Sequence, residues 1–280
     1  MTKIRKLIME DFVMFKGKHE IEFATDEKDR VTVIVGENGT GKTTIVDAIK
    51  GALGIKRPIP RYLEMNEGQR IDPEALDWIS KNAKANVEIE GDKIRNRADD
   101  ELCHFLDGEL LHVGFPELKE DKIVGTDVNV NDSFIDEMNE LFVKSGSYKQ
   151  HLHFARDKNS IFYVNDVGQK YIPSAFHKII QGMIFWIVFK RRISPKSFII
   201  ADSIFGRLKT HSRISFFEML KETDAQIVLL VTDNEYRGIA GDGSNDDPYK
   251  SLREIIIEQM NVKEYNLVRT EEGTKIKLIH

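Results

Sequence analysis

Residues 31–53 read VTVIVGENGTGKTTIVDAIKGAL, and the fold is decided within this stretch. Its first five residues are all β-branched, which is the composition of a strand that is buried on both faces. Gly36 follows directly, and residues 42–53 then have the hydrophobic periodicity of a helix, which Gly54 closes. A strand, a glycine turn and a helix in this order predict the core of an α/β fold.

The turn at residues 36–43, GENGTGKT, fits the phosphate-loop pattern of glycine, four residues and Gly-Lys-Thr. Such glycines let successive backbone N–H groups face a phosphate chain, and the start of the helix adds positive potential. We expect Lys42 to reach the β- and γ-phosphates and Thr43 to ligate Mg²⁺. A chance glycine turn is the alternative, but the strand before the motif and the helix after it favour nucleotide binding. The residues predicted to bind the nucleotide here are Gly36, Asn38, Gly39, Gly41, Lys42, Thr43 and Thr44.

A phosphate loop needs a second carboxylate for its Mg²⁺, delivered from the end of a neighbouring strand. The apolar run FIIAD at residues 198–202 ends on Asp202. Asp202 could simply cap the following turn, as aspartate often does. The run before it places Asp202 at the carboxyl edge of a sheet, where α/β proteins bind ligands. We therefore predict that Thr43 and Asp202 hold the metal.

Strands and helices are expected on both sides of this core. Residues 3–10 and 19–23 predict an antiparallel pair of strands connected across residues 15–18. Ser133 and Asp136 resemble a capping box, which predicts a helix that buries Phe134, Met138 and Leu141. The other predicted strands span residues 86–90, 93–97, 160–164, 197–201, 226–231, 262–269 and 274–279, and the other predicted helices span residues 73–84, 174–192, 210–221 and 247–260.

The composition is that of an ordinary globular chain of 280 residues, and 41% hydrophobic residues exclude a disordered or collagen-like protein. With 41 basic and 46 acidic side chains the net charge is −5, so no global basic field draws the chain to DNA. DNA contact stays possible only as a local feature. The single cysteine, Cys103, cannot form an internal disulfide, and the apolar run at residues 179–189 is too short to span a bilayer. We expect a cytoplasmic protein with no membrane association.

The whole chain resembles an ABC-type ATPase head of the SMC, SbcC and RecF group. Three stretches carry the resemblance, namely FVMFKGK at residues 12–18, FGRL at 205–208 and LVTDNE at 230–235. They are most similar to SbcC-type break-repair heads and DndD-like ATPases. The position of Asp202, 159 residues after Thr43, fits the same group.

The resemblance implies a P-loop NTPase with a two-lobed, ABC-type α/β head, in which an antiparallel N-terminal subsheet joins a mixed sheet. It implies an N-terminal lobe at residues 1–145 with the phosphate loop, and a C-terminal lobe at residues 146–280. ATP and Mg²⁺ are the implied cofactors, and a second ATPase head is the implied partner.

The chain departs from this group at residues that complete the site. The signature that grips the nucleotide of the opposite head matches SAFHK, beginning at Ser174, and only its first two residues survive. Phe176 stands where the group has a glycine whose bare backbone approaches the phosphate. Ser203 stands where the group has the catalytic glutamate, and serine is a poor general base at pH 7. Thr232 matches the switch histidine, and no glutamine is well placed for the loop that senses Mg²⁺.

On this reading Lys42, Asp202 and Ser203 are the catalytic positions, and Ser174 is a further nucleotide-binding residue. Mg-ATP binding with slow or partner-dependent hydrolysis is predicted, and the resemblance implies a role in DNA repair or DNA defence. The alternative is a non-hydrolysing regulatory subunit that uses ATP as a structural clamp for a partner head. A small-molecule kinase would need a substrate lid with several arginines after the loop. The two arginines found there, Arg57 and Arg61, are too few.

A homodimer would pair two intact phosphate loops with two altered signatures. A heterodimer with a more complete head is therefore favoured over a homodimer.

Several basic, histidine and acidic residues elsewhere could have either a binding role or a purely structural one. Residues 190–192, Lys-Arg-Arg, end a predicted helix and could touch DNA phosphates or only complement the helix dipole. His177 is expected at the surface rather than on a phosphate, because helix N-termini disfavour imidazolium. Two sets have partial metal-site spacing but lack the remaining ligands, namely His151 with His153, and Asp242 with Ser244 and Asp246.

Overall fold

The computed structural model describes residues 2–26, 29–55, 81–90, 105–107, 118–124, 126–145, 152–193, 196–206, 208, 210–238 and 251–280. Some predicted features lie outside the described residues, namely most of the helix at 73–84, the strand at 93–97, Arg57, Arg61, Cys103, His151, Asp242, Ser244 and Asp246.

The centre of the fold is a six-stranded sheet in the order β14-β13-β3-β12-β11-β5. Its strands are β3 (Val31–Gly36), β5 (Phe105–Asp107), β11 (Phe198–Asp202), β12 (Gln226–Val231), β13 (Val262–Thr270) and β14 (Gly273–Leu278). Neighbouring strands are parallel except β13 and β14, which form an antiparallel hairpin. The predicted mixed sheet is therefore present, and every residue of β3, β11 and β12 is buried.

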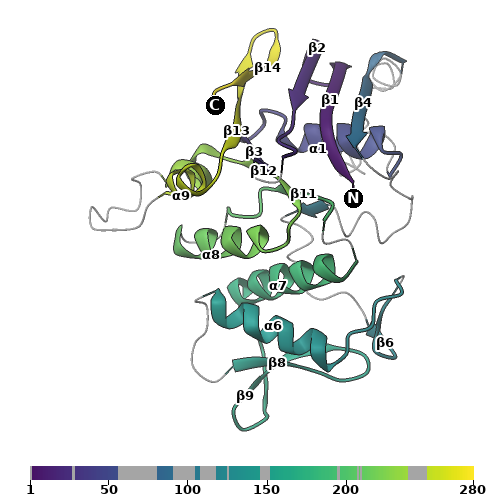
Figure 1. Ribbon diagram of the computed structural model, residues 1–280, viewed down its shortest axis with the longest axis vertical. Coiled ribbons are helices and arrows are strands. Elements are labelled where there is room, and N and C mark those ends of the chain that lie inside the picture. Colours follow the sequence, from purple (N-terminus) through teal and green to yellow (C-terminus); the bar gives the residue numbers. More distant parts are fainter. Residues whose placement is uncertain are drawn as a thin grey trace, which may run out of the picture.

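Alternate residues of the buried strands face two separate hydrophobic clusters. Val33 and Leu229 pack in the cluster that includes α7 (Ala175–Ile193) and α8 (Thr210–Lys221). Ile34 and Leu230 pack in the cluster that includes α1 (Lys42–Ala52). Because successive side chains of a strand point to opposite faces, a strand covered on both faces needs apolar residues at consecutive positions. Figure 1 shows the resulting layers, with α1 on one side of the sheet and α7 and α8 on the other.

The N-terminal sheet consists of β1 (Lys3–Phe12), β2 (Phe15–Glu22) and β4 (Lys84–Glu90), with β1 in the middle. The predicted antiparallel pair is confirmed, and β4 covers the strand predicted at residues 86–90. The predicted connection at residues 15–18 is wrong, because Val13 and Met14 make the turn. Val13 has a left-handed φ of 58°, and Phe15 is fully buried. Burial of Phe15 in the core keeps it in the strand, so the turn has to precede it.

A further layer lies beyond α7. There α6 (Asp132–Lys144) packs on α7 and on β8 (Leu152–Arg156), which continues into β9 (Ile161–Asn165) and β10 (Lys170–Tyr171). The predicted face of Phe134, Met138 and Leu141 is buried. The N-cap, however, is Asn131 and not Ser133, since the Asn131 side chain accepts a hydrogen bond from the Phe134 N–H at 3.0 Å. The division into lobes at residue 145 remains a prediction, and α6 packs with elements that follow this boundary.

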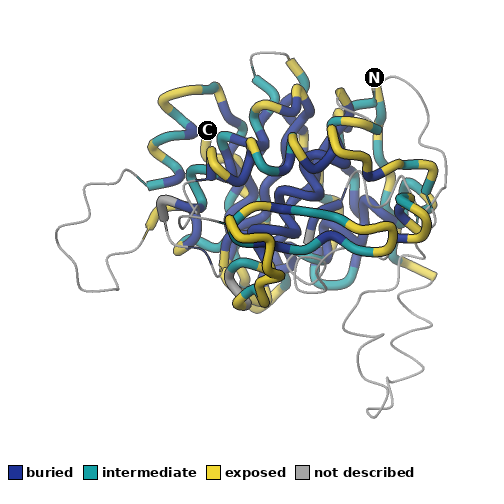
Figure 2. Tube along the Cα trace, turned by 90° about the horizontal axis from the view of Figure 1, so that it is seen from below, coloured by how far each residue is buried: buried dark blue, intermediate teal, exposed yellow. Residues whose placement is uncertain are grey.

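The chain closes with α9 (Leu252–Gln259) and the β13–β14 hairpin. Ser251 and Glu254 form a capping box, so α9 begins later than the predicted start at residue 247. A small two-stranded sheet, β6 (Leu118–Lys119) and β7 (Lys122–Ile123), lies before α6. In the part of the chain that the structure describes, no helix has both the length and the apolar character needed to cross a membrane. Figure 2 shows the buried residues gathered in the interior strands and helices, with exposed residues along the outer turns.

Candidate functional site

The phosphate loop folds as a glycine-dependent turn between β3 and α1. Gly39 and Gly41 have φ values of 81° and 100°, in the region that favours glycine. A Cβ on Gly41 would lie 2.5 Å from Sδ of Met14, and one on Gly36 would collide with Oγ1 of Thr40. Gly41 is the N-cap of α1 and supplies no side-chain acceptor for the first N–H groups of the helix. An anion can bind those groups instead.

Lys42 is buried at the start of α1, 6% exposed. Its Nζ donates hydrogen bonds to the carbonyl oxygens of Gly36 at 2.6 Å and Glu37 at 3.1 Å. Burial lowers the pKa of Lys42, and the nearby carboxylates of Asp202, Glu235 and Glu37 oppose this shift. The loop thus holds a desolvated cation, whose protonated form a bound phosphate would stabilise.

Thr43 and Asp202 lie together, as predicted. The Thr43 hydroxyl donates a hydrogen bond to Oδ2 of Asp202 at 2.8 Å, and Asp202 is buried at the end of β11. A hydroxyl and a carboxylate are hard oxygen donors of the kind that Mg²⁺ prefers. The two side chains therefore fit the predicted metal. Of the other predicted binders, Asn38 and Gly39 are exposed on the loop and Thr44 is buried in α1.

Ser203 follows Asp202 directly and is exposed. Its hydroxyl donates a hydrogen bond to Oδ1 of Asp202 at 3.2 Å, and its N–H donates to the Leu230 carbonyl at 2.9 Å. The backbone of Ser203 is left-handed, with φ of 54°, which costs a non-glycine residue about 1 kcal/mol or more. The position next to Asp202 is as predicted, and a catalytic role for Ser203 remains a prediction.

Two residues to which the sequence patterns assigned no role organise the loops behind Asp202. Glu235 is buried and accepts hydrogen bonds from the N–H and the hydroxyl of Thr232 at 2.6 and 3.0 Å. Arg213 of α8 donates to the carbonyl of Leu208, after β11, at 2.8 Å and to that of Asn234, after β12, at 3.0 Å. The spacing from Thr232 to Glu235 is that of a capping box and could have indicated Glu235. Nothing local marks Arg213, because its partners come from two other loops.

Ser174 lies immediately before α7, which belongs to the cluster on the face of the sheet opposite α1. The Ser174 hydroxyl is 2.7 Å from Nδ1 of His177, and His177 is partly exposed, as expected. Among the described residues, no hydrogen bond joins Ser174 to the phosphate loop. The structure therefore does not bring the predicted signature residue to the nucleotide site of its own chain. The Phe176 side chain is outside the part of the chain that the structure describes, so its predicted obstruction of the phosphate stays a prediction.

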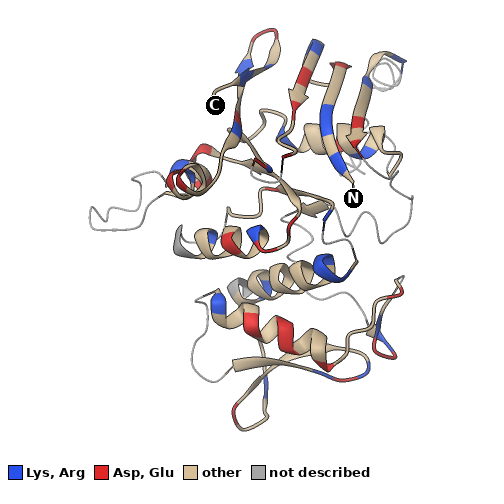
Figure 3. Cartoon of the chain, in the orientation of Figure 1, with Lys and Arg blue, Asp and Glu red and all other residues tan. Residues whose placement is uncertain are grey.

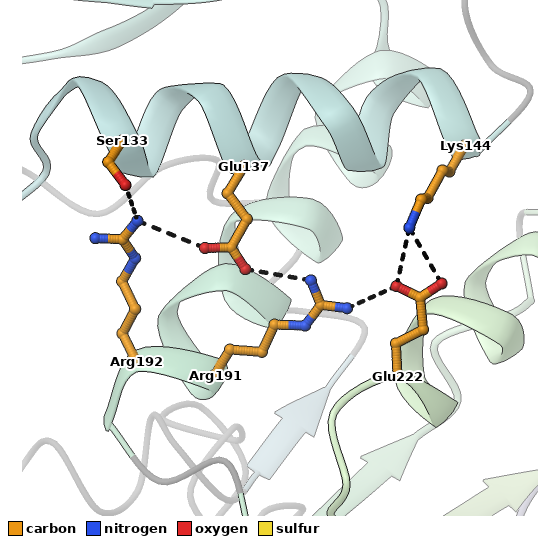
Figure 4. Close-up of polar contacts among 6 residues, drawn as sticks. All are labelled: Ser133, Glu137, Lys144, Arg191, Arg192 and Glu222. Carbon is orange, nitrogen blue, oxygen red and sulfur yellow. Dashed lines mark hydrogen bonds and ion pairs between the residues drawn. The ribbon is translucent and has the colours of Figure 1, made fainter.

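Two of the three basic residues at the end of α7 pair with carboxylates within the fold. Lys190 is fully buried. Arg191 pairs with Glu137 at 3.2 Å and with Glu222 at 2.9 Å, and Arg192 pairs with Glu137 at 3.5 Å. Figure 4 shows these pairs joining α6, α7 and the end of α8, and Figure 3 shows the rest of α7 almost without charge. A structural role for residues 190–192 is therefore favoured over contact with DNA.

In the described ranges, no group of three or more His, Cys, Asp or Glu side chains could hold a metal.

The sequence was compared with known protein families, and the match includes the phosphate loop with β3 before it and α1 after it. Residues 6–170 match a family model described as an AAA domain, and this range is more than half of the chain. The chain belongs to this AAA domain family. The matched part of the AAA domain begins in β1, includes the phosphate loop and ends at β10. No curated protein sequence matches the chain.

The AAA domain chain is similar to solved SMC heads over nearly its full length. The SMC head domain from Thermotoga maritima has 15% identity and a TM-score of 0.55, with 99% of each chain covered. The SmcHead bound to the C-winged helix domain of ScpA has 14% identity and a TM-score of 0.61, with 99% of this chain and 98% of that chain covered. The Smc head with an extended coiled coil, bound to the C-terminal domain of ScpA and derived from Pyrococcus furiosus, has 12% identity and a TM-score of 0.63, with 100% and 96% covered.

At these identities the likeness establishes the fold. The predicted α/β, ABC-type P-loop NTPase head is confirmed. Family and fold together indicate an ATP-binding ATPase head.

Proposed function

We propose that this AAA domain chain is an SMC/SbcC-like head that binds Mg-ATP and hydrolyses it slowly or only with a partner. The observation that carries the proposal is the 2.8 Å hydrogen bond between Thr43 and Asp202, next to the buried Lys42. It brings a phosphate-binding cation and two oxygen ligands together at the start of α1. This is the set of groups that phosphoryl-transfer sites of the phosphate-loop class use.

Each group has a distinct part in this function. The N–H groups around Gly39 and Gly41 and the ammonium of Lys42 would bind the phosphates. Thr43 and Asp202 would hold Mg²⁺, which supplies neutralisation of charge on the β- and γ-phosphate oxygens. Gly36, Asn38 and Thr44 complete the proposed nucleotide-binding set.

Slow hydrolysis rests on Ser203. A water that attacks the terminal phosphate needs a group to orient it and accept its proton, and a serine hydroxyl beside Asp202 is poorly suited to this. The hydroxyl of Ser203 is also engaged with the Asp202 carboxylate at 3.2 Å. A non-hydrolysing regulatory subunit, which uses ATP as a clamp, is the second candidate that this residue favours.

The position of Ser174 supports the proposal of a partner. Since Ser174 and the phosphate loop are not joined within one chain, a complete site of the type that the resemblance implies needs a second head. We propose a heterodimer with a more complete head over a homodimer, and a setting in DNA repair or DNA defence. Two of the similar SMC heads are described as bound to ScpA, which supports a protein partner for this chain as well.

The test combines ATP titration with turnover on the purified chain, with Ser203→Glu as the gain-of-function variant and Ser203→Ala as its matched control. We expect ATP binding with turnover well below about 1 s⁻¹, the lower end for kinases. Ser203→Glu should raise turnover, and Ser203→Ala should not. Failure to bind ATP would contradict the whole proposal. Fast turnover by the unmodified, isolated chain would contradict impaired hydrolysis, and ATP binding without hydrolysis under any condition would favour the clamp.

A further inference from the structure

We propose that Arg269, in the C-terminal hairpin, is a phosphate-binding residue of the nucleotide site. The proposal rests on the proposed function and adds a residue to it that lies far from the phosphate loop in sequence. Its chemical target is the anionic phosphate chain of a nucleoside di- or triphosphate held by the loop.

Strand pairing brings the hairpin to the loop. β13 runs parallel to β3, and their register places Leu267 opposite Gly36, the first residue of the loop. The residues of β13 that follow Leu267 therefore run on alongside the loop itself. A guanidinium nitrogen of Arg269, Nη1, lies 3.7 Å from the position of a Cβ on Gly39.

The end of the hairpin is held in place by contacts with the N-terminal hairpin. The Thr274 N–H donates to the Met14 carbonyl at 2.9 Å, and a Cβ on Gly273 would lie 2.6 Å from the same oxygen. Met14 and Phe15 in turn approach Gly41 closely, at 2.5 and 2.9 Å from a Cβ there. Figure 1 shows the two hairpins rising from the same side of the central sheet, and β14 contacts β2. Arg269 thus lies on β13, and the end of the β13–β14 hairpin packs against the β1–β2 turn. That turn contacts the phosphate loop.

The charge of Arg269 is available for a ligand. Arg269 is exposed, and it forms no hydrogen bond or ion pair with any residue that the structure describes. Three other cations near the C-terminal hairpin are paired, since Arg237 and Arg253 bind Glu264, and Lys275 binds Glu272. An ordinary solvated arginine is the simpler reading, but it does not explain why this cation lies against a loop whose N–H groups suit an anion. A guanidinium offers two parallel donors that match phosphate oxygens.

The experiment compares Arg269→Ala and Arg269→Lys with Lys277→Ala in the purified full chain. Lys277 is an exposed cation of the same hairpin, so its removal changes the net charge equally without touching the loop. Titrations use Mg-ATP and Mg-ADP at low and at high salt. We expect Arg269→Ala to weaken Mg-ATP binding by about tenfold or more, as loss of a charge-assisted hydrogen bond does. Arg269→Lys should be intermediate, and Lys277→Ala should stay within about twofold of the unmodified chain.

The outcomes separate this proposal from the proposed function. A loss confined to Mg-ATP would assign Arg269 to the terminal phosphate, and an equal loss for Mg-ADP would assign it to the phosphates that both share. Arg269→Ala affinities equal to those of Lys277→Ala for both nucleotides would overturn the inference while leaving nucleotide binding intact. If the unmodified chain binds neither nucleotide, the proposed function fails instead. Equal unfolding temperatures of the two alanine variants would exclude a folding defect as the cause.

Discussion

The hydroxyl of Thr43 donates a hydrogen bond to Oδ2 of Asp202 at 2.8 Å, across 159 residues of sequence. Thr43 lies in α1, which follows β3, and Asp202 ends β11, and β12 lies between β3 and β11 in the sheet. The bond therefore depends on three strands being in the correct order and register. It links the start of α1 to the end of β11, and it is the contact on which the proposed metal site rests.

Asp202→Asn should weaken Mg-ATP binding by about tenfold and leave ATP binding in excess chelator nearly unchanged. Asparagine keeps the size of the side chain but removes the negative charge that a divalent cation needs. Equilibrium titration with and without Mg²⁺ measures this difference. Ser203→Ala is the control, because it removes the 3.2 Å bond to Asp202 and keeps the carboxylate. Equal losses in the presence and absence of Mg²⁺ would argue against a metal role for Asp202.

As the pH is raised, ATP affinity should begin to fall at a lower pH than it would at a site whose lysine has an ordinary pKa. Burial lowers the pKa of Lys42 from its usual 10.5, so the free protein loses this proton at lower pH. Phosphates favour the protonated form, so binding above that pKa must take up a proton, and affinity should drop about tenfold per pH unit. Titrations across the alkaline range measure the slope. Lys42→Arg should lower affinity overall but flatten the slope, and an equally steep slope in Lys42→Arg would exclude Lys42 as its source.

Gly41→Ala should destabilise the protein by about 3 kcal/mol and abolish ATP binding. The new Cβ would meet Sδ of Met14 at 2.5 Å and the ring of Phe15 at 2.9 Å, at a φ of 100°. Gly168→Ala is the matched control, since Gly168 has φ of 77° and no atom within 4 Å of the added Cβ. It should cost about 1 kcal/mol and leave ATP binding unchanged. Urea unfolding and nucleotide titration distinguish the two, and similar costs at both glycines would refute the packing argument.

Removing both arginines that face Glu264 should cost more stability than neutralising Glu264 itself. Glu264 is fully buried, whereas its partners Arg237 and Arg253 are 40% and 36% exposed at their side chains. The double alanine variant leaves the buried Glu264 charge with only a long, 3.5 Å hydrogen bond from the Tyr236 hydroxyl and no cation among the side chains that the structure describes, at about 3 kcal/mol or more. Glu264→Gln leaves two arginines that water can solvate, at about 1 kcal/mol. Denaturant unfolding measures both, and the reverse order would contradict this account.

The control for that comparison is the exposed pair of Lys275 and Glu272, at 3.3 Å. Lys275→Ala should change stability by no more than about 0.5 kcal/mol, because water and salt screen exposed pairs. A larger effect there would mean that removal of any hairpin charge perturbs the fold, and the Glu264 result would lose its meaning.

Several sequence predictions failed where tertiary packing competes with local pattern. The residues at 15–18 look like a turn, but burial of Phe15 moves the turn back to Val13 and Met14. Ser133 has the spacing of a cap, but Asn131 precedes it and reaches the Phe134 N–H first. The sequence did not decide between two roles for the basic residues at 190–192, and the positions of Glu137 on α6 and Glu222 directly after α8 favour a structural role.

The sequence by itself determined the parts of the nucleotide site that are local. A β-branched run needs burial on both faces, glycines permit the left-handed turn at Gly39 and Gly41, and Lys42 and Thr43 follow within the same loop. The position of Asp202 at the end of a buried strand was also predicted from sequence, because an apolar strand that ends on aspartate is itself a local pattern. The tertiary structure alone decided which distant groups lie beside the phosphate loop and behind Asp202. Arg269 reaches its place through the parallel pairing of β13 with β3, and Arg213 joins the loops after β11 and β12. Local residue preferences do not encode that order of strands, since it arises only when the strands bury their two faces together.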